Sequence, residues 1–269
     1  MKSKSLIILN ILFYFSFTNV FCVEFKGSFY QGSFILGKTQ AGAKVKIDER
    51  NVLVTDDGYF AFGIGRDRKN DISIRVVKGQ DLDVVVKKVF KRKYRIQRID
   101  GLPEKKVTPP KEVYERIKRE NKIIVAAREI ESDLTFFTKE FINPLDKAIV
   151  TGVYGSQRIL NGKPKWPHYG IDFAAKEGTK IKAMLDGTAT MVEPDLFYTG
   201  GTLIFDHGHG ISTLYMHMKD IYVKKGQRIK QGEIIGTVGS TGRSTGPHLD
   251  VRLNWFGVRL DPATVLDLK

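Results

Sequence analysis

Histidine and aspartate recur at short, even spacings in the C-terminal half of this chain, and these residue types can bind a metal ion or transfer protons. His168 and Asp172 lie four positions apart in KWPHYGIDFAA, and His248 and Asp250 lie two positions apart in TGPHLDVRLNW. An even spacing places two side chains on the same face of a strand. Each pair also fits an ordinary hydrogen-bonded or ionic contact, so neither pair alone predicts a metal site.

Residues 245–255 alternate between polar and apolar types, which predicts a strand with one face on a hydrophobic core. The apolar face comprises Leu249, Val251, Leu253 and Trp255, and the polar face comprises His248, Asp250, Arg252 and Asn254. We expect the polar face to contact water. An ion pair between Asp250 and Arg252 is the alternative to a metal site, although exposed pairs of this kind contribute only about 0 to 1 kcal/mol to stability.

The segment ISTLYMHM, residues 211–218, predicts a second strand that carries His217. Regular alternation places Leu214, Met216 and Met218 on one face, and Thr213, Tyr215 and His217 on the other. His217 is therefore predicted to lie on a polar face, as His248 and Asp250 do on their strand. His207 and His209, in DHGHG, are predicted to lie on a tight turn, exposed to solvent or at most behind the metal ligands.

The N-terminus has a basic start followed by a short apolar run from Leu6 to Phe17, which is typical of a secretory signal peptide. We predict a signal over residues 1–22 and an exported, periplasmic or cell-wall-associated protein. An uncleaved anchor is the alternative, whereas bulky Phe21 disfavours lipid attachment at Cys22. Cys22 is the only cysteine, so the mature protein would contain no disulfide and no thiolate zinc site.

The net charge is +14, from 44 basic and 30 acidic residues. A positive long-range field favours polyanionic partners. For an exported protein these are anionic lipid headgroups and the anionic cell wall, and we expect no nucleic-acid partner. A generally lysine-rich proteome is the alternative explanation.

The chain is predicted to be mainly β, with a small β-sandwich over residues 23–100 and an antiparallel β domain over residues 141–269. The first of these contains short strands with turns between them and no histidine. Residues 101–140 are predicted to hold a proline-containing linker and one amphipathic helix of about 20 residues that packs across the domain junction. No stable membrane span is expected once the signal is removed.

In order along the chain, HxxxD (168–172), LYMH ending at His217 and GPHLD (246–250) resemble the lysostaphin/LytM family of zinc metalloendopeptidases, which have a duplicated hybrid motif fold. Supporting segments are VYGSQR (153–158), HYGIDFAA, TVGSTGRSTGPH and RLDP (259–262). The resemblance covers residues 141–269, about half of the chain.

The resemblance implies an endopeptidase that binds one Zn²⁺ per chain and hydrolyses the peptide crosslinks or stem peptides of peptidoglycan. His168 and Asp172 would be zinc ligands, and His217 and His248 would be the catalytic histidines. The family's last motif is normally His-x-His, so Asp250 stands where a zinc-binding histidine is expected. A carboxylate oxygen binds zinc at about 2.0 to 2.2 Å, close to the distance of an imidazole nitrogen, so we predict His168, Asp172 and Asp250 as the metal ligands.

One histidine and two carboxylates would cancel the charge of Zn²⁺, so its bound water should be less acidic than is usual for the family. Discrimination against manganese or iron should also be weaker. Tyr154 and Tyr215 could add hydrogen bonds to the reacting groups.

A catalytically inactive regulator that activates other cell-wall hydrolases is the alternative function, because Asp250 departs from the family pattern. The N-terminal domain could bind an envelope protein partner or shield the active-site groove.

Overall fold

The computed structural model describes residues 23–101, 107–147 and 149–268. The predicted signal peptide, including Cys22, lies outside the described residues. Strands are far more abundant than helices in the described chain, which has one long helix, and this confirms the mainly β fold class. In these three ranges, no helix is both long and apolar enough to cross a membrane.

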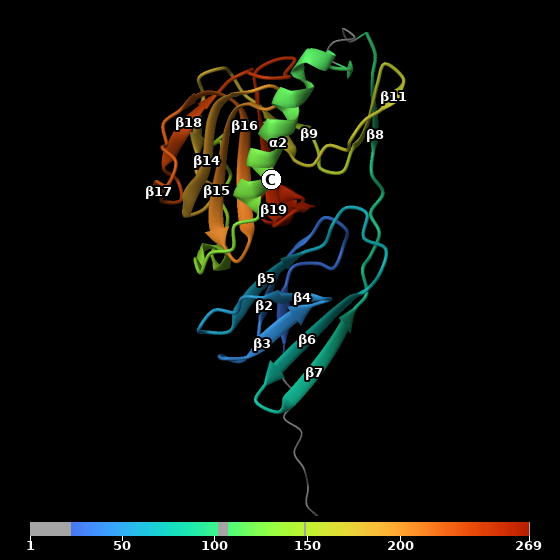
Figure 1. The fold of residues 1–269 in the computed structure, drawn as a ribbon, viewed down its shortest axis with the longest axis vertical. Helices are drawn as coiled ribbons and strands as arrows, with labels where there is room; N and C mark the ends of the chain where they lie inside the picture. Colours follow the sequence, from blue (N-terminus) through green and yellow to red (C-terminus); the bar gives the residue numbers. More distant parts are fainter. Residues whose placement is uncertain (1–22, 102–106, 148, 269) are drawn as a thin grey trace, which may run out of the picture.

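The first seven strands form two antiparallel sheets at the N-terminal end of the molecule (Figure 1). One sheet has the order β1 (Glu24–Lys26), β2 (Phe34–Lys38), β5 (Tyr59–Gly63), and the other has the order β4 (Arg50–Val52), β3 (Lys44–Ile47), β6 (Ile72–Lys78), β7 (Asp81–Lys87). Buried residues of both sheets, such as Ile35, Phe60, Val45 and Ile74, belong to a single hydrophobic core. In β3 and β6 alternate residues are buried in this core, as the period of a β-strand requires.

The two halves of the molecule are packed against each other. Arg92 forms an ion pair of 2.7 Å with Asp261, and the backbone N–H of Asp261 donates to the carbonyl of Gly32 at 2.8 Å. The rings of Phe62 and Trp255 meet edge to face, with centroids 6.5 Å apart. One continuous core therefore joins the N-terminal strands to the C-terminal sheet.

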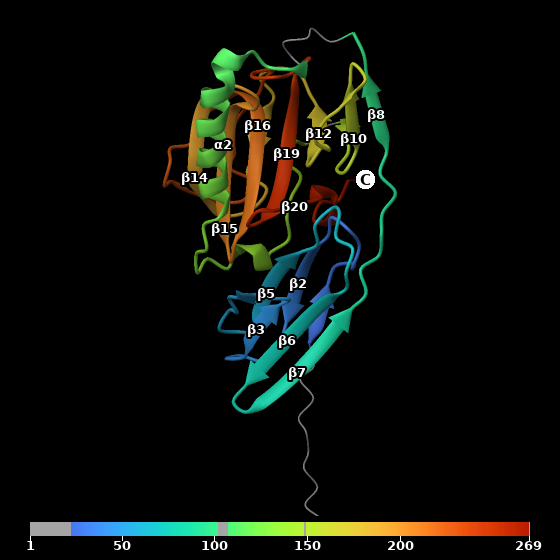
Figure 2. The same cartoon turned by 45° about the vertical axis from the view of Figure 1, so that its right-hand side comes forward.

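After β7 the chain runs along the side of the molecule to β8 (Ile96–Ile99), which pairs in parallel with β10 (Gln157–Leu160) of the C-terminal half (Figure 2). A 3₁₀ turn, η1 (Lys111–Val113), follows, and then the helix α2 (Tyr114–Arg128). Pro110 directly precedes the turn and has an extended backbone.

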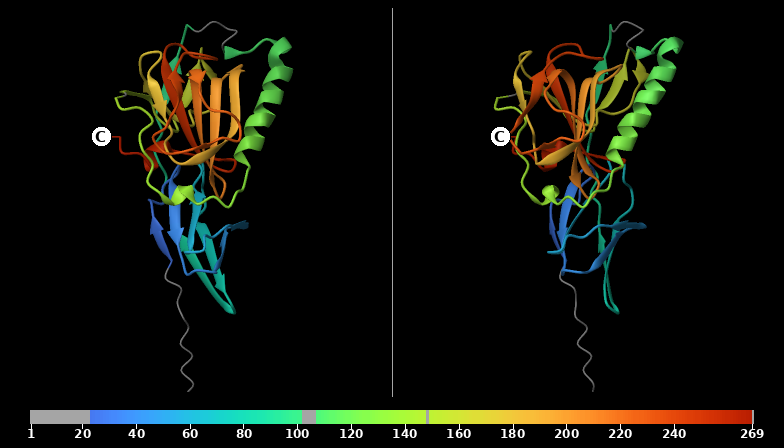
Figure 3. Two further views of the ribbon diagram at one scale, coloured as in Figure 1. Left: turned by 90° about the vertical axis from the view of Figure 1, so that its left-hand side faces the viewer. Right: turned by 60° about the vertical axis from the view of Figure 1, so that its left-hand side comes forward.

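Helix α2 is shorter than the helix that the sequence predicts, and it lies on the C-terminal sheet (Figure 3). Ala127 and Ile124 pack with residues such as Ile204 and Leu214 of that sheet. Glu120 accepts a hydrogen bond from the backbone N–H of Phe197 at 2.8 Å. The prediction that this helix packs across the domain junction was wrong, because Ile124, Ala127 and Glu120 all contact the C-terminal half.

The C-terminal half is built around a ten-stranded antiparallel sheet with the main order β17-β14-β15-β16-β19-β12-β9. Its strands are β9 (Ile149–Gly152), β12 (Ile171–Ala174), β13 (Lys180–Lys182), β14 (Gly187–Leu196), β15 (Gly200–Gly208), β16 (Ile211–Ile221), β17 (Arg228–Ile229), β18 (Ile234–Val238), β19 (His248–Trp255) and β20 (Val258–Leu260). The remaining elements are β11 (Lys163–Pro164), which pairs with β10, and the 3₁₀ turns η2 (Phe136–Thr138) and η3 (Pro262–Thr264).

Strand β19 has the alternation that the sequence predicts. Leu249, Val251 and Leu253 are fully buried in the core. Its polar face is less exposed to solvent than expected, since Asp250 is 3% exposed and Asn254 is fully buried. Gly170, in the loop that leads into β12, lies against Asp250 and Arg252 and covers part of this face.

Candidate metal centre

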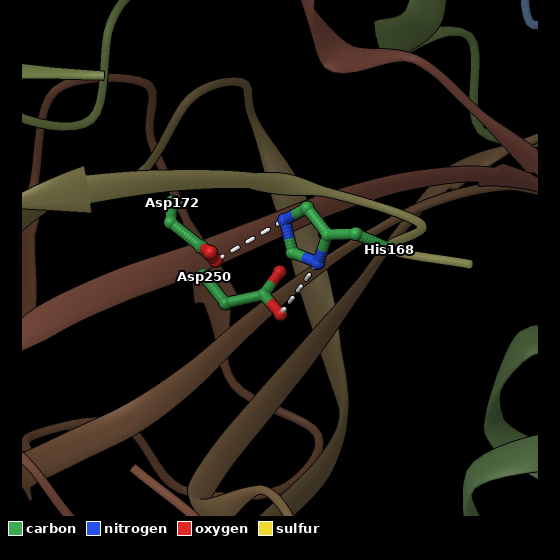
Figure 4. Close-up of side chains that lie close together, drawn as sticks. All are labelled: His168, Asp172 and Asp250. Atoms are coloured by element: carbon green, nitrogen blue, oxygen red, sulfur yellow. Dashed lines mark ion pairs between the residues drawn. The ribbon is translucent and has the colours of Figure 1, made fainter. Parts of the chain in front are cut away.

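Asp172 and Asp250 lie directly opposite each other on the neighbouring strands β12 and β19. Opposed residues of an antiparallel pair share a face, and two like charges in this arrangement repel each other. The imidazole of His168, from the loop before β12, faces both carboxylates and turns one ring nitrogen toward each (Figure 4). Its Nε2 is 3.2 Å from Asp172 Oδ1 and its Nδ1 is 4.0 Å from Asp250 Oδ2. The structure therefore brings together the three residues that the sequence predicts as ligands.

Several donor atoms of this cluster are buried without a hydrogen-bond partner. His168 is 2% exposed, and neither of its ring nitrogens is hydrogen-bonded. Asp172 Oδ1 is also buried and unsatisfied. One ligand atom from each of His168, Asp172 and Asp250 lies within 4.8 Å of the others. Because an unsatisfied buried polar atom is unfavourable, this nitrogen and oxygen donor set fits a divalent cation such as Zn²⁺.

Two glycines make room for the carboxylates. A Cβ at Gly170 would collide with Asp250 Oδ1, and a Cβ at Gly152 would collide with the carboxylate of Asp172. The absence of a side chain at Gly170 therefore admits the carboxylate of Asp250.

Each carboxylate also pairs with an arginine. Arg252 donates to Asp250 from Nε at 3.3 Å and from a terminal nitrogen at 3.0 Å, and Arg158 donates to Asp172 Oδ2 at 3.3 Å. The ion pair that the sequence suggests as an alternative to the metal site therefore coexists with the clustering of Asp250 and His168. The charge balance expected from the sequence omits these two guanidinium groups, which neutralise the two carboxylates and leave the charge of a bound cation uncancelled.

Burial alone would raise the pKa of Asp250, but the attraction of Arg252 and His168 outweighs burial and holds this pKa well below its usual range. Asp250 is therefore a carboxylate at neutral pH, as a metal ligand must be.

His217 reaches the site by a route that the sequence did not predict. Tyr215 and Met218 both lie in the main core, whereas Met216 lies opposite Asp250 on the outer face. The regular alternation through residue 218 was wrong, because His217 has a left-handed backbone with φ of 61°. This turn breaks the period of two and carries the imidazole to the outer face, beside His248.

The rings of His217 and His248 lie with centroids 4.6 Å apart. His217 Nδ1 is 2.8 Å from the carbonyl of Thr241, and His248 Nδ1 is 2.8 Å from the carbonyl of Gly246. Since a carbonyl can only accept, each Nδ1 carries a proton and each Nε2 is left to accept or deliver one. Burial lowers the pKa of His217, against the opposing attraction of Asp250, so the neutral imidazole is favoured as a proton acceptor.

The remaining histidines belong to the core. His207 is fully buried in β15, and its ring contacts the carbonyl of Asp186 at 2.6 Å and the hydroxyl of Thr213 at 2.8 Å. His209 lies in the turn after β15, as predicted, but it is only 5% exposed and packs on the ring of Phe137. The prediction that these two histidines are exposed or lie behind the ligands was wrong, because η2 and the loop before it cover the turn.

The suggested tyrosines do not face the centre. The Tyr154 hydroxyl donates to the carbonyl of Arg259 at 2.8 Å, and the Tyr215 hydroxyl accepts from the backbone N–H of Met184 at 2.8 Å. Both are structural residues.

Sequence reasoning missed Arg158 as a partner of Asp172, and it missed Thr199 and Thr241 as the residues that hold His217. The carbonyl of Thr199 accepts from the backbone N–H of His217 at 2.8 Å. Arg158 stands in the VYGSQR segment, but nothing in its spacing links it to Asp172, because β10 and β12 belong to different sheets.

The part of the chain that carries this centre is similar to known peptidases. Residues 166–262 match the family described as peptidase family M23. An uncharacterized metalloprotease of Haemophilus influenzae is 40% identical over 99 residues, which are 37% of this chain and 21% of that protein. The peptidoglycan DD-endopeptidase ShyC of Vibrio cholerae is 37% identical over 125 residues, 46% of this chain and 28% of that protein.

A crystal structure of a putative peptidase M23 from Pseudomonas aeruginosa is similar over most of the molecule. It is 26% identical, has a TM-score of 0.69, and covers 88% of this chain and 95% of its own. The matched region spans only 21% and 28% of the length of these two curated relatives.

Proposed function

Residues 166–262 form a domain of peptidase family M23, and on that premise we propose that the protein is a zinc-dependent endopeptidase that hydrolyses peptide crosslinks or stem peptides of bacterial peptidoglycan. The observation that carries the proposal is the convergence of His168, Asp172 and Asp250, with buried unsatisfied donor atoms, on one face of the sheet that also carries His217 and His248.

His168, Asp172 and Asp250 would hold one Zn²⁺. When bound, the cation would polarise the scissile carbonyl and activate a water molecule. His217 is suited to take a proton at Nε2, since its Nδ1 proton is fixed on Thr241 and its pKa is lowered by burial. His248 is held in the same tautomer by Gly246, and its Nε2 is available to donate to the developing oxyanion once protonated.

Arg158 and Arg252 orient the two carboxylates and keep the centre positive. A more positive centre withdraws more electron density from a bound water. We therefore propose that the water is more acidic than the ligand set alone would suggest, which compensates for the replacement of a histidine by Asp250.

Incubation of the full chain with purified sacculi and zinc tests the activity. We expect release of soluble muropeptides from sacculi, no release by His168→Ala, and loss of bound zinc in that variant. Equal background release by both proteins would contradict the proposal.

A catalytically inactive regulator of other wall hydrolases is the second candidate, and the ion pair between Asp250 and Arg252 favours it, because that pair satisfies Asp250 without a metal. Metal analysis separates the two functions. A peptidase should purify with, or readily take up, about one zinc per chain, whereas a regulator need bind none.

We also propose export to the periplasm or the cell wall, which the composition of residues 1–22 supports. Fractionation of cells that produce the full-length chain tests this location.

A protein partner for the N-terminal domain remains a proposal as well. The outer face of β7 offers an exposed apolar row, with Leu82, Val84 and Val86 48% to 63% exposed. Cross-linking in envelope extracts, compared between the natural chain and Val84→Lys, would detect such a partner. The same cross-links in both proteins would exclude β7 as the binding surface.

A further inference from the structure

A group of arginines lies next to the metal centre on the same face of the sheet. Arg252 follows Asp250 on the polar side of β19. Arg259 on β20 pairs across the ladder with Asn254, the next residue on that side. Because opposed residues share a face, Arg252 and Arg259 lie side by side on the outer face of the sheet.

Arg128 reaches this group from helix α2. It is the last residue of the helix, and its neighbour Ala127 packs in one cluster with Leu214. Leu214 is the cross-strand partner of Arg252. The end of α2 therefore brings a third guanidinium over the row of the sheet that holds Arg252.

Of these three arginines, only Arg252 forms an ion pair with an acidic side chain in the described part of the chain. Arg252 is paired with Asp250. Arg128 is only 6% exposed, and within the described part of the chain it forms no ion pair, while its Nε is buried without a hydrogen bond. The Nε of Arg259 is likewise buried and unsatisfied, and its guanidinium stacks on the ring of Tyr169 at 4.8 Å. A buried guanidinium without a partner is unfavourable.

The electrostatics agree with this geometry. Burial, followed by repulsion from Arg259 and Arg252, lowers the pKa of Arg128 to about 10, and Glu129 opposes the shift only in part. Arg128 is still charged at neutral pH, so the fold holds a buried positive charge close to Arg252, the partner of the predicted ligand Asp250.

We propose that Arg128, Arg252 and Arg259 form an anion subsite that binds a carboxylate group of the peptide substrate beside the metal centre. The assignment of the ligand to a substrate peptide rests on the proposed function. Arginine is suited to this role because its planar fork makes two parallel hydrogen bonds to a carboxylate. Tyr169, which supports Arg259, directly follows His168, so a carboxylate bound here would fix the register of the peptide relative to the metal.

Binding of a synthetic acidic stem tetrapeptide to the full chain, measured by calorimetry in the presence of a chelator, tests the subsite. A second probe is the same peptide with its carboxyl groups amidated. We expect the free-acid peptide to bind at least about tenfold more tightly, since a charge-assisted hydrogen bond is lost on amidation. Arg128→Gln and Arg259→Gln should each remove most of this difference.

The matched control is Arg228→Gln, which removes the same charge from an exposed position on β17, at the far side of the sheet. This variant should keep the preference for the free acid. An equal affinity of the natural chain for both peptides, or a preference that survives in Arg128→Gln and Arg259→Gln, would overturn the proposal. Inorganic phosphate that binds as tightly as the free-acid peptide would also overturn it, because the subsite would then select phosphate groups.

Because the chelated protein is used, this experiment is independent of catalysis. A chain that binds no zinc and releases no muropeptides can still show the carboxylate preference, so failure of the proposed function and failure of the subsite are distinguishable. Thermal unfolding of each variant provides the structural control. Loss of binding with an unchanged or higher Tm supports the subsite, whereas loss confined to variants with a lower Tm overturns it.

Discussion

Asp250 and Arg252 are expected to act as a unit, so that restoring a histidine at position 250 destabilises the protein. Asp250 is 3% exposed, the side chain of Arg252 is 25% exposed, and two hydrogen bonds of 3.0 and 3.3 Å join them. Removing one partner of a buried ion pair costs about 3 to 5 kcal/mol. Because Arg252 retains contact with water, we expect Asp250→His to lower the free energy of unfolding by about 2 to 3 kcal/mol.

The same substitution in an Arg252→Leu chain leaves no guanidinium without its partner. There we expect a loss below about 1 kcal/mol, and hence a coupling free energy of about 1 to 3 kcal/mol between the two positions. Urea unfolding of the four proteins at pH 7, followed by tryptophan fluorescence in the presence of a chelator, gives this value without any contribution from metal. An equal loss in both backgrounds would refute the reasoning, because the pair would then contribute nothing to the choice of aspartate at this position.

Three further predictions follow from the described contacts. His217→Gln and His248→Gln should each lower muropeptide release by about 10²- to 10⁴-fold, and the zinc content of both variants should stay unchanged. Loss of zinc from either variant would instead indicate that the histidine binds the metal. Burial opposes ionisation of Asp186, but hydrogen bonds from the backbone of Gln231 and from Lys139 lower its pKa overall. Its stabilising effect is therefore present above the unfolded pKa of about 4 and is lost as the pH falls below that value through the lower pKa of the folded state. Asp186→Asn should show a shallower loss of stability below about pH 4 in acid titrations of the unfolding free energy. Burial lowers the pKa of His207 to about 4, so the folded state should lose stability as the pH falls below about 6.5. Thr213→Val removes one hydrogen bond of that ring and should destabilise the protein by about 1 kcal/mol. An unchanged unfolding free energy of this variant would contradict the prediction.

The N-terminal strands, the strands of the C-terminal half and the candidate ligand set were all predictable from sequence, since they depend on local periodicity and on the order of HxxxD, LYMH and GPHLD. The alternation of Leu249, Val251 and Leu253 determines which face of β19 enters the core, because successive side chains on a strand point to opposite faces. That alternation also places Asp250 on the face of β19 that points away from the core, which is the face that carries Asp172 on the neighbouring strand.

Only the tertiary structure decided how His217 and the arginines are used. The backbone N–H of left-handed His217 donates to the carbonyl of Thr199, the residue directly before β15, and no pattern within ISTLYMHM predicts this contact. The pairing of Arg158 with Asp172 joins strands of two different sheets, and the approach of Arg128 to Arg252 joins segments that are far apart in the chain. Such contacts are fixed by strand register and helix packing, and sequence spacing carries no information about them when the partners belong to different elements.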